Sequence, residues 1–138
     1  MCLKVKKKKV KKNNKIQKRN KLKVRTIAHI HIFSSHNNTI ITLTSKIGDT
    51  ISWATSSSIG FKGCKKSIHY ASQNASEKIG RTALNLGFKN VNLYIKGFGF
   101  GRDYALRGVF NSGIKVLSMH DITPIPHNGC KIKKIRRK

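Results

Sequence analysis

Acidic residues are scarce in this 138-residue sequence. It contains four Asp and Glu against 30 Lys and Arg, for a formal net charge of +26. The acids are Asp49, Glu77, Asp103 and Asp121, which are scattered along the chain. This scarcity argues against a hydrolase built on clustered carboxylates. The uncompensated positive charge predicts a polyanionic partner.

Long apolar runs and cysteine pairs are also missing. No stretch approaches the roughly 18 apolar residues that a membrane span needs, so no membrane partner is expected. The chain starts without the apolar core of a signal peptide. Its three cysteines, Cys2, Cys64 and Cys130, form no CxxC pair, which favours a reducing compartment. We expect the protein to work in the compartment where it is made.

The positive charge divides the chain into three parts. Residues 1–25 carry 13 Lys and Arg with no acid, and residues 131–138 carry six more. We predict a basic N-terminal extension over 1–25, one globular domain over 26–130 and a basic C-terminal tail over 131–138. Both tails are expected to be disordered without a partner and to lie along nucleic acid.

Hydrophobic periodicity predicts an α/β domain. Alternating or β-branched stretches predict strands over 28–33, 39–44 and 50–54, and we expect these three strands to form an antiparallel meander. Helical spacing follows over 68–86, then a strand over 91–95, a helix over about 103–112 and a strand over 114–122. The order βββαβαβ predicts a mixed sheet of about five strands with helices on both faces.

A glycine-rich loop follows the fourth predicted strand. Gly97, Gly99 and Gly101 allow close backbone approach, and Lys96 and Arg102 flank them, so the loop is a candidate phosphate cradle. The alternative is an ordinary crossover turn. The GxGxG spacing lacks the third glycine position of a dinucleotide fingerprint, and we therefore expect no cofactor.

Two further segments are candidates for RNA contact. Residues 56–66 form a Ser- and Gly-rich loop that carries Lys62, Lys65 and Lys66, although a solvated loop explains these lysines equally well. Residues 123–130 contain two prolines and then an Asn-Gly turn. Such a stiff segment is expected to aim the basic tail at one place.

Three weaker patterns have simpler explanations. His29 and His31 share a strand face, but without a third ligand they are expected to be packed or RNA-facing rather than a metal site. Phe98 and Phe100 are suited both to base stacking in an exposed position and to packing on the sheet, and the sequence favours neither alternative. A Cys–His catalytic pair has no support in the spacing.

Several motifs resemble one known family, the bacterial-type eleventh protein of the small ribosomal subunit. The resemblance is collinear over about residues 26–138, and the TPIPHNGC string at 123–130 is its most specific part. The other matching motifs are His29–His31, Asn37–Thr42, Trp53–Thr55, Gly60–Gly63, and Lys96–Arg102 without its two phenylalanines.

The resemblance implies a ribonuclease-H-like motif without nuclease activity, in a protein that binds ribosomal RNA on the subunit platform near the messenger RNA exit site. Implied neighbours are the sixth, eighteenth and twenty-first small-subunit proteins, with the seventh across the exit channel. Phe98 and Phe100 stand where the family usually has proline. The excess of Lys over Arg (23 to 7), with 17 Ile and 11 Asn, indicates an A/T-rich genome. It favours a mitochondrial ribosome over a plastid or bacterial one.

We therefore predict a non-catalytic constituent of the small ribosomal subunit, with no cofactor and no metal. The alternatives are a ribonuclease-H-like enzyme, which would need clustered acids, and a free nucleic-acid-compacting protein. The expected RNA-binding residues are Lys62, Lys65, Lys66, Lys96, Gly97, Gly99, Gly101, Arg102, Arg107, His127, Asn128, Gly129, Lys131, Lys133, Lys134, Arg136, Arg137 and Lys138.

Overall fold

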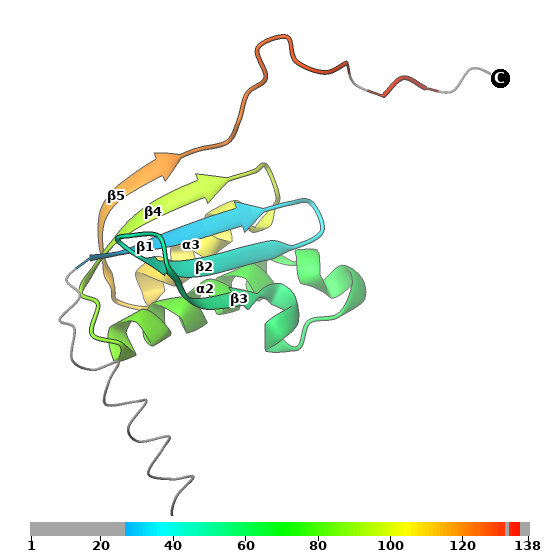
Figure 1. Ribbon diagram of the computed structural model, residues 1–138. Coiled ribbons are helices and arrows are strands. Elements are labelled where there is room, and N and C mark those ends of the chain that lie inside the picture. Colours follow the sequence, from blue (N-terminus) through cyan, green and yellow to red (C-terminus); the bar gives the residue numbers. More distant parts are fainter. Residues whose placement is uncertain (1–26, 132, 136–138) are drawn as a thin grey trace, which may run out of the picture.

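The computed structural model describes residues 27–131 and 133–135 (Figure 1). The predicted basic extension 1–25 and residues Arg136, Arg137 and Lys138 lie outside this range. The strands are β1 (Ile27–Ser34), β2 (Thr39–Ser45), β3 (Thr50–Thr55), β4 (Asn90–Lys96) and β5 (Lys115–Asp121). The α-helices are α2 (His69–Asn85) and α3 (Gly101–Asn111), and the 3-10 helices are η1 (Ser56–Ile59) and η2 (Gly63–Ser67).

The five strands form one sheet in the order β3-β2-β1-β4-β5. β1 pairs antiparallel with β2, and β2 with β3, which is the predicted meander. β1 pairs parallel with β4, and β4 with β5, and helical crossovers connect β3 to β4 and β4 to β5. The mixed five-stranded α/β fold predicted from the sequence is confirmed.

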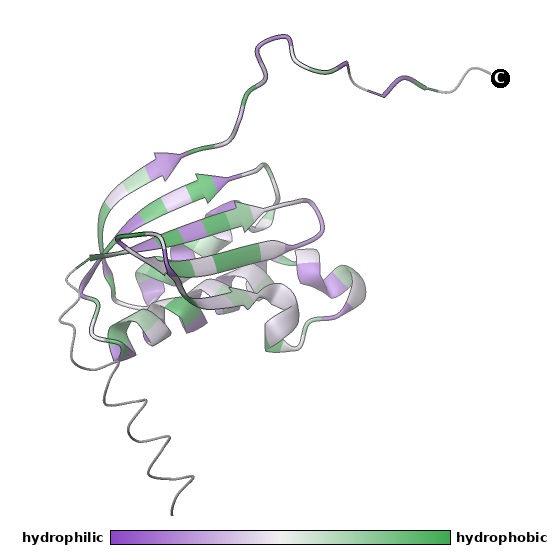
Figure 2. Cartoon of the chain, in the orientation of Figure 1, coloured by the Kyte–Doolittle hydropathy of each residue, from purple (hydrophilic) through white to green (hydrophobic). Residues whose placement is uncertain are grey.

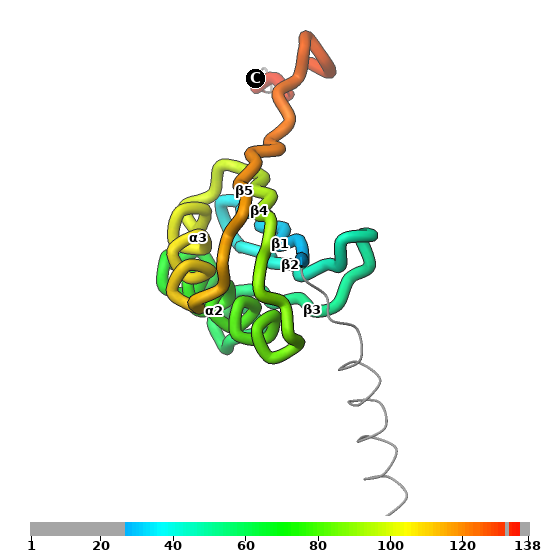
Figure 3. The backbone as a smooth tube through the Cα atoms, turned by 90° about the vertical axis from the view of Figure 1, so that its left-hand side faces the viewer, coloured from blue at the N-terminus to red at the C-terminus, as the bar shows by residue number. Residues whose placement is uncertain are grey.

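The prediction of helices on both faces is wrong. α2 and α3 pack against each other and lie on the same side of the sheet (Figure 3). The reason lies in the strand order, because the crossovers β3-α2-β4 and β4-α3-β5 progress in one direction across the sheet. Two right-handed crossovers that progress in the same direction place their helices on the same face.

The core fills the space between the helices and this one face. Strand residues alternate between apolar and polar (Figure 2), so that Ile30, Ile32, Leu43 and Leu93 point to the helices and are fully buried. The other side of the sheet, which we call the open sheet face, is covered by no helix within the described residues. Among those residues, neither α-helix has the length and apolar character that a bilayer crossing requires.

The segment 56–66, expected to be a loop, folds instead into η1 and most of η2. Thr55 caps η1 by accepting a hydrogen bond from Ser58 N at 3.1 Å, and Ser58 Oγ accepts one from Thr55 N at 2.9 Å. This reciprocal pair is a capping box. Ser58, one of the serines that suggested an open loop, therefore helps to cap a short helix.

Candidate nucleic-acid interface

The segments singled out from the sequence meet at one end of the molecule. β1, β4 and β5 are parallel, so their carboxyl ends point the same way (Figure 1). The glycine loop follows β4, and the C-terminal segment follows β5. The carboxyl ends of parallel strands are also where open α/β sheets usually place their ligands.

His69, the first residue of α2, joins the lysine-bearing segment to the glycine loop. Its Nδ1 lies 3.1 Å from the carbonyl oxygen of Phe100, which accepts the hydrogen bond. Its ring stacks on Tyr104 of α3, with the ring centroids 4.3 Å apart. The guanidinium carbon of Arg107 lies 5.2 Å from the Tyr104 centroid, a cation–π distance. These contacts bring residues from α2, the glycine loop and α3 into one surface, and η2 lies just before α2 in the chain.

We call this surface the basic end and define it by the side chains of Lys62, Lys65, Lys66, Lys96 and Arg107. Four of the five are exposed, and Lys66 is half-buried. None of the five forms an ion pair within the described part of the chain, where the two pairs are Arg81–Glu77 and Arg102–Asp121. Their charges are therefore available to an anionic partner.

The glycines of the loop are required by packing inside the protein. A Cβ on Gly97 would overlap with the backbone oxygen of Ser34, and one on Gly99 would overlap with that of Ser35. Gly101 is equally crowded, by side chains of β2 and α2. Gly97 also has a φ of 99°, in the region that favours glycine. The three glycines let the loop lie on the β1–β2 turn, and a role in phosphate binding stays a prediction.

Arg102 is held within the protein rather than pointing freely at a ligand. Its Nη2 donates to Asp121 Oδ2 at 2.6 Å, and its Nη1 donates to the carbonyl of Gly97 at 3.3 Å. Thr123 completes the network, because its hydroxyl donates to Asp121 Oδ1 at 2.6 Å and accepts a hydrogen bond from Gly97 N at 3.1 Å. The glycine loop is thereby tied to the start of the C-terminal segment.

This network also fixes the ionisation of Asp121. The hydrogen bond from the Thr123 hydroxyl, followed by those from Arg102 and from the Thr123 backbone, lowers the pKa of Asp121 from 3.8 to about 2. Asp121 is thus a carboxylate at any physiological pH. Its charge is balanced by Arg102, so it does not oppose an approaching phosphate as an unpaired acid would.

The C-terminal segment leaves the body at the carboxyl end of β5 (Figure 1). Ile122 N donates to Ile95 O at 2.8 Å, and beyond Thr123 the described residues form neither helix nor strand. Asn128 adopts a φ of 52°, which suits the Asn-Gly turn expected from the sequence. The candidate residues of this segment are all exposed, namely His127, Asn128, Gly129, Lys131, Lys133 and Lys134.

The two phenylalanines of the glycine loop are exposed, so the alternative in which they pack on the sheet is wrong. Phe98 is 74% exposed and Phe100 is 67% exposed. Phe100 makes edge contacts with His36 and His69, whose ring centroids both lie 6.3 Å away. His36, His69, Tyr104 and Thr123 were not among the residues chosen from the sequence. The only local feature that could have indicated one of these four residues was the position of His69 at the start of a predicted helix.

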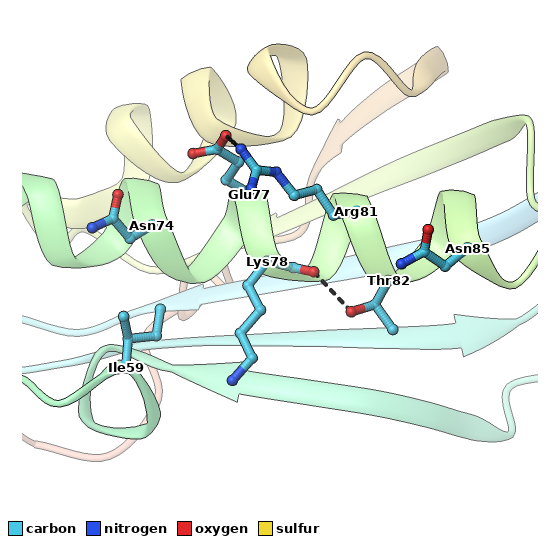
Figure 4. Close-up of a pocket in the computed structure, with 7 residues that line it drawn as sticks. All are labelled: Ile59, Asn74, Glu77, Lys78, Arg81, Thr82 and Asn85. Carbon is cyan, nitrogen blue, oxygen red and sulfur yellow. Dashed lines mark hydrogen bonds and ion pairs between the residues drawn. The ribbon is translucent and has the colours of Figure 1, made fainter.

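A hollow of about 410 Å³ lies beside α2, away from these residues (Figure 4). Its lining includes the Arg81–Glu77 ion pair and Lys78, whose carbonyl accepts a hydrogen bond from Thr82 Oγ1 at 2.8 Å. No residue predicted from the sequence to bind RNA lines it. Within the described residues, no group of three or more His, Cys, Asp or Glu side chains is arranged to hold a metal ion.

Comparison with known proteins agrees with the motifs. A family profile described as Ribosomal protein S11 matches residues 28–137. The chain is 47% identical over 131 residues to the "Small ribosomal subunit protein uS11" of Janthinobacterium sp. (strain Marseille), covering 95% of this chain and 90% of that protein. It is 51% identical over 111 residues to uS11 of Nitrosococcus oceani, covering 80% and 86% of the two chains. It is 50% identical over 108 residues to uS11c of Trieres chinensis, covering 78% and 83%. The chain therefore belongs to the ribosomal protein S11 family.

Proposed function

We propose that the basic end and the C-terminal segment bind ribosomal RNA in the small ribosomal subunit. As a member of its family, the chain is a structural constituent of that subunit and not an enzyme. The observation that carries the proposal is that five exposed or half-buried cations without an ion pair share one end of the sheet with the start of the C-terminal segment, namely Lys62, Lys65, Lys66, Lys96 and Arg107. Lysines on several elements reach phosphates as point charges, and such contacts supply affinity.

The residues of the site divide into two groups. The side chains of the basic end and of residues 127–138 contact RNA, mainly at phosphates. Arg102 and the three glycines act as positioning residues, because their contacts lie within the protein. Together with Thr123 they fix the direction in which the C-terminal segment leaves the domain. This assignment refines the sequence prediction, in which Arg102 was expected to contact RNA directly.

The family resemblance supports a proposal for the place in the subunit. We propose a position on the platform near the messenger RNA exit site, beside the sixth, eighteenth and twenty-first small-subunit proteins and facing the seventh. The extended C-terminal segment is suited to threading between RNA helices, since eight residues from 124 to 131 run without regular structure.

We also propose a mitochondrial ribosome as the location. The support is the excess of Lys over Arg and the frequent Ile and Asn. The relatives described above are bacterial and plastid proteins, so that location rests on composition alone.

Sedimentation of a lysate from the source, with mass spectrometry across the gradient, tests the function. The protein should travel with the small subunit at physiological salt and leave it only at high salt. Ultraviolet cross-linking in the same fractions should join RNA to residues of the basic end and of the C-terminal segment. A protein that stays at the top of the gradient, or travels with DNA, would contradict the proposal.

A further inference from the structure

The open sheet face carries a row of side chains to which every strand contributes one residue. The pairing register places Trp53 of β3 opposite Thr42 of β2, Thr42 opposite His31 of β1, His31 opposite Tyr94 of β4, and Tyr94 opposite His120 of β5. On the four strands β1 to β4 the neighbours of these residues point to the helices, as the full burial of Ile30, Ile41, Ala54 and Leu93 shows, and the His120 ring of β5 stacks on Tyr94. The row therefore faces away from the core.

Three members of this row form a stack of nearly parallel rings. The centroids of His31 and Tyr94 lie 5.0 Å apart at an interplanar angle of 14°, and those of Tyr94 and His120 lie 5.3 Å apart at 22°. His29 adds a tilted ring 5.2 Å from Tyr94. Centroid spacings close to the strand separation of about 4.8 Å indicate rings that stand side by side on neighbouring strands. Imidazole and phenol groups of this kind both donate and accept hydrogen bonds.

Trp53 lies at the other end of the row and is an exposed ring. It is 63% exposed, and its neighbour in the row is the small side chain of Thr42. Trp is enriched at interfaces, because its ring offers a large apolar surface and its N–H a hydrogen-bond donor. No ring contact is formed by Trp53 within the described residues.

The charge of the open sheet face suits RNA. The four acids of the chain lie elsewhere: Asp49 is in the β2–β3 turn, Glu77 in α2, Asp103 in α3, and Asp121 at the end of β5 in contact with Arg102. Lys96, which belongs to the basic end, pairs with Phe33 in the register at the edge of the open sheet face. The row thus combines rings, hydrogen-bonding groups and a nearby cation, with no carboxylate to repel a phosphate.

We propose that the open sheet face binds unpaired nucleotides of RNA, with a base stacked on Trp53 and the sugar–phosphate chain running over the His31, Tyr94 and His120 edges toward Lys96. The inference rests on the proposed function and adds a second, stacking surface to the electrostatic one. Unpaired nucleotides fit better than a duplex, because a base must expose its face to stack on a side chain.

Trp53 is the only tryptophan in the chain, so its fluorescence reports on this face alone. The full chain is titrated with a single-stranded RNA of about a dozen nucleotides, and with a duplex of the same sequence. Binding is followed by the anisotropy of a labelled RNA, and Trp53 emission is followed with unlabelled RNA. We expect the single strand to quench Trp53 in step with binding, and the duplex to bind with little quenching.

Variants give a second readout. Trp53→Ala should weaken single-strand binding by about fivefold to a hundredfold, the range expected for loss of one stacked base. Ile47→Ala is the control, since Ile47 is 91% exposed in the β2–β3 turn and takes no part in the row. Circular dichroism checks that each variant is folded, and the quenching experiment on the unmodified chain does not depend on them.

The outcomes separate the two proposals. No change in anisotropy with either RNA would contradict the proposed function itself. Saturated binding with unchanged Trp53 emission, and equal affinity of Trp53→Ala and Ile47→Ala, would overturn the stacking inference alone. The open sheet face would then be free for a neighbouring protein. Equal quenching by duplex and single strand would also overturn it, because a duplex does not offer its base faces.

Discussion

Removing charge at one end of the sheet should affect RNA binding more than removing the same charge at the other end. The perturbation is the triple change of Lys62, Lys65 and Lys66 to Gln, which lowers the formal charge from +26 to +23. These side chains lie on or next to η2, which follows β3 at the same end of the sheet as the glycine loop after β4. They form no ion pair within the described residues, so the substitution leaves no unpaired acid behind.

The expected magnitude follows from counterion release. Each phosphate contact contributes about 0.7 to 0.9 to the slope of log K against log salt. Loss of three contacts lowers that slope by about 2 to 2.7. The affinity lost between about 50 and 200 mM salt should therefore shrink by a factor of about 20 to 40. The assay is anisotropy or filter binding of the full chain to small-subunit ribosomal RNA across that salt range.

A matched control uses three exposed lysines at the opposite end of the sheet. Lys46 lies in the β2–β3 turn, Lys89 immediately precedes β4, and Lys115 starts β5. Changing them to Gln removes the same charge and should leave the salt slope almost unchanged. Equal slopes for the two triple variants would refute the reasoning, since RNA would then respond only to total charge.

Three further predictions concern stability and ionisation. Gly80→Ala should destabilise the fold by about 1 to 3 kcal/mol in urea unfolding, because the added Cβ would overlap with the Ser112 side chain. Helix propensity alone would predict a gain of roughly 1 kcal/mol. Adding Ser112→Gly should restore most of the lost stability, and purely additive effects of the two changes would argue against the overlap. The Asp121 carboxyl should titrate with a pKa of about 2 by NMR, and its contribution to stability should be present above pH 3.8 and be lost between pH 3.8 and about 2. Thr123→Val should raise this pKa, and a pKa near 3.8 in the unmodified chain would disprove the network. Burial, and secondarily the charge of His29, lower the pKa of His31 below 6.5, so the free energy of unfolding should fall as the pH drops below 6.5. His31→Phe should reduce this pH dependence of stability, and an unchanged pH dependence would contradict the assignment.

The elements of the fold were readable from local patterns. Period-two alternation over Ala28–Phe33 marked a strand with one buried face, and β1 shows that alternation in its burial. Helical spacing from Ile68 to Leu86 agrees with α2 to within one residue at each end. Such patterns are reliable because the burial of one face is a property of each segment by itself.

The arrangement of the site was only partly readable. The sequence indicated the lysines, the glycine loop and the C-terminal segment as separate candidates. Their convergence depends on His69 and Tyr104, which contact each other across 35 positions of the chain. Local patterns carry no information about contacts of this kind, because they arise from the packing of α2 on α3. The true partners of Arg102 were hidden for the same reason, since Asp121 is reached only through the parallel pairing of β4 and β5.

The sequence by itself determined the class of partner and the order of the elements. With 30 basic and four acidic residues, the chain requires a polyanionic partner whatever its fold. The alternation of apolar residues fixes which side of each strand is buried. Only the tertiary structure decided that both helices cover one face, because handedness acts on whole crossovers and not on single segments. That decision leaves Trp53, His31, Tyr94 and His120 in one row on the open sheet face, from four strands that are far apart in the chain.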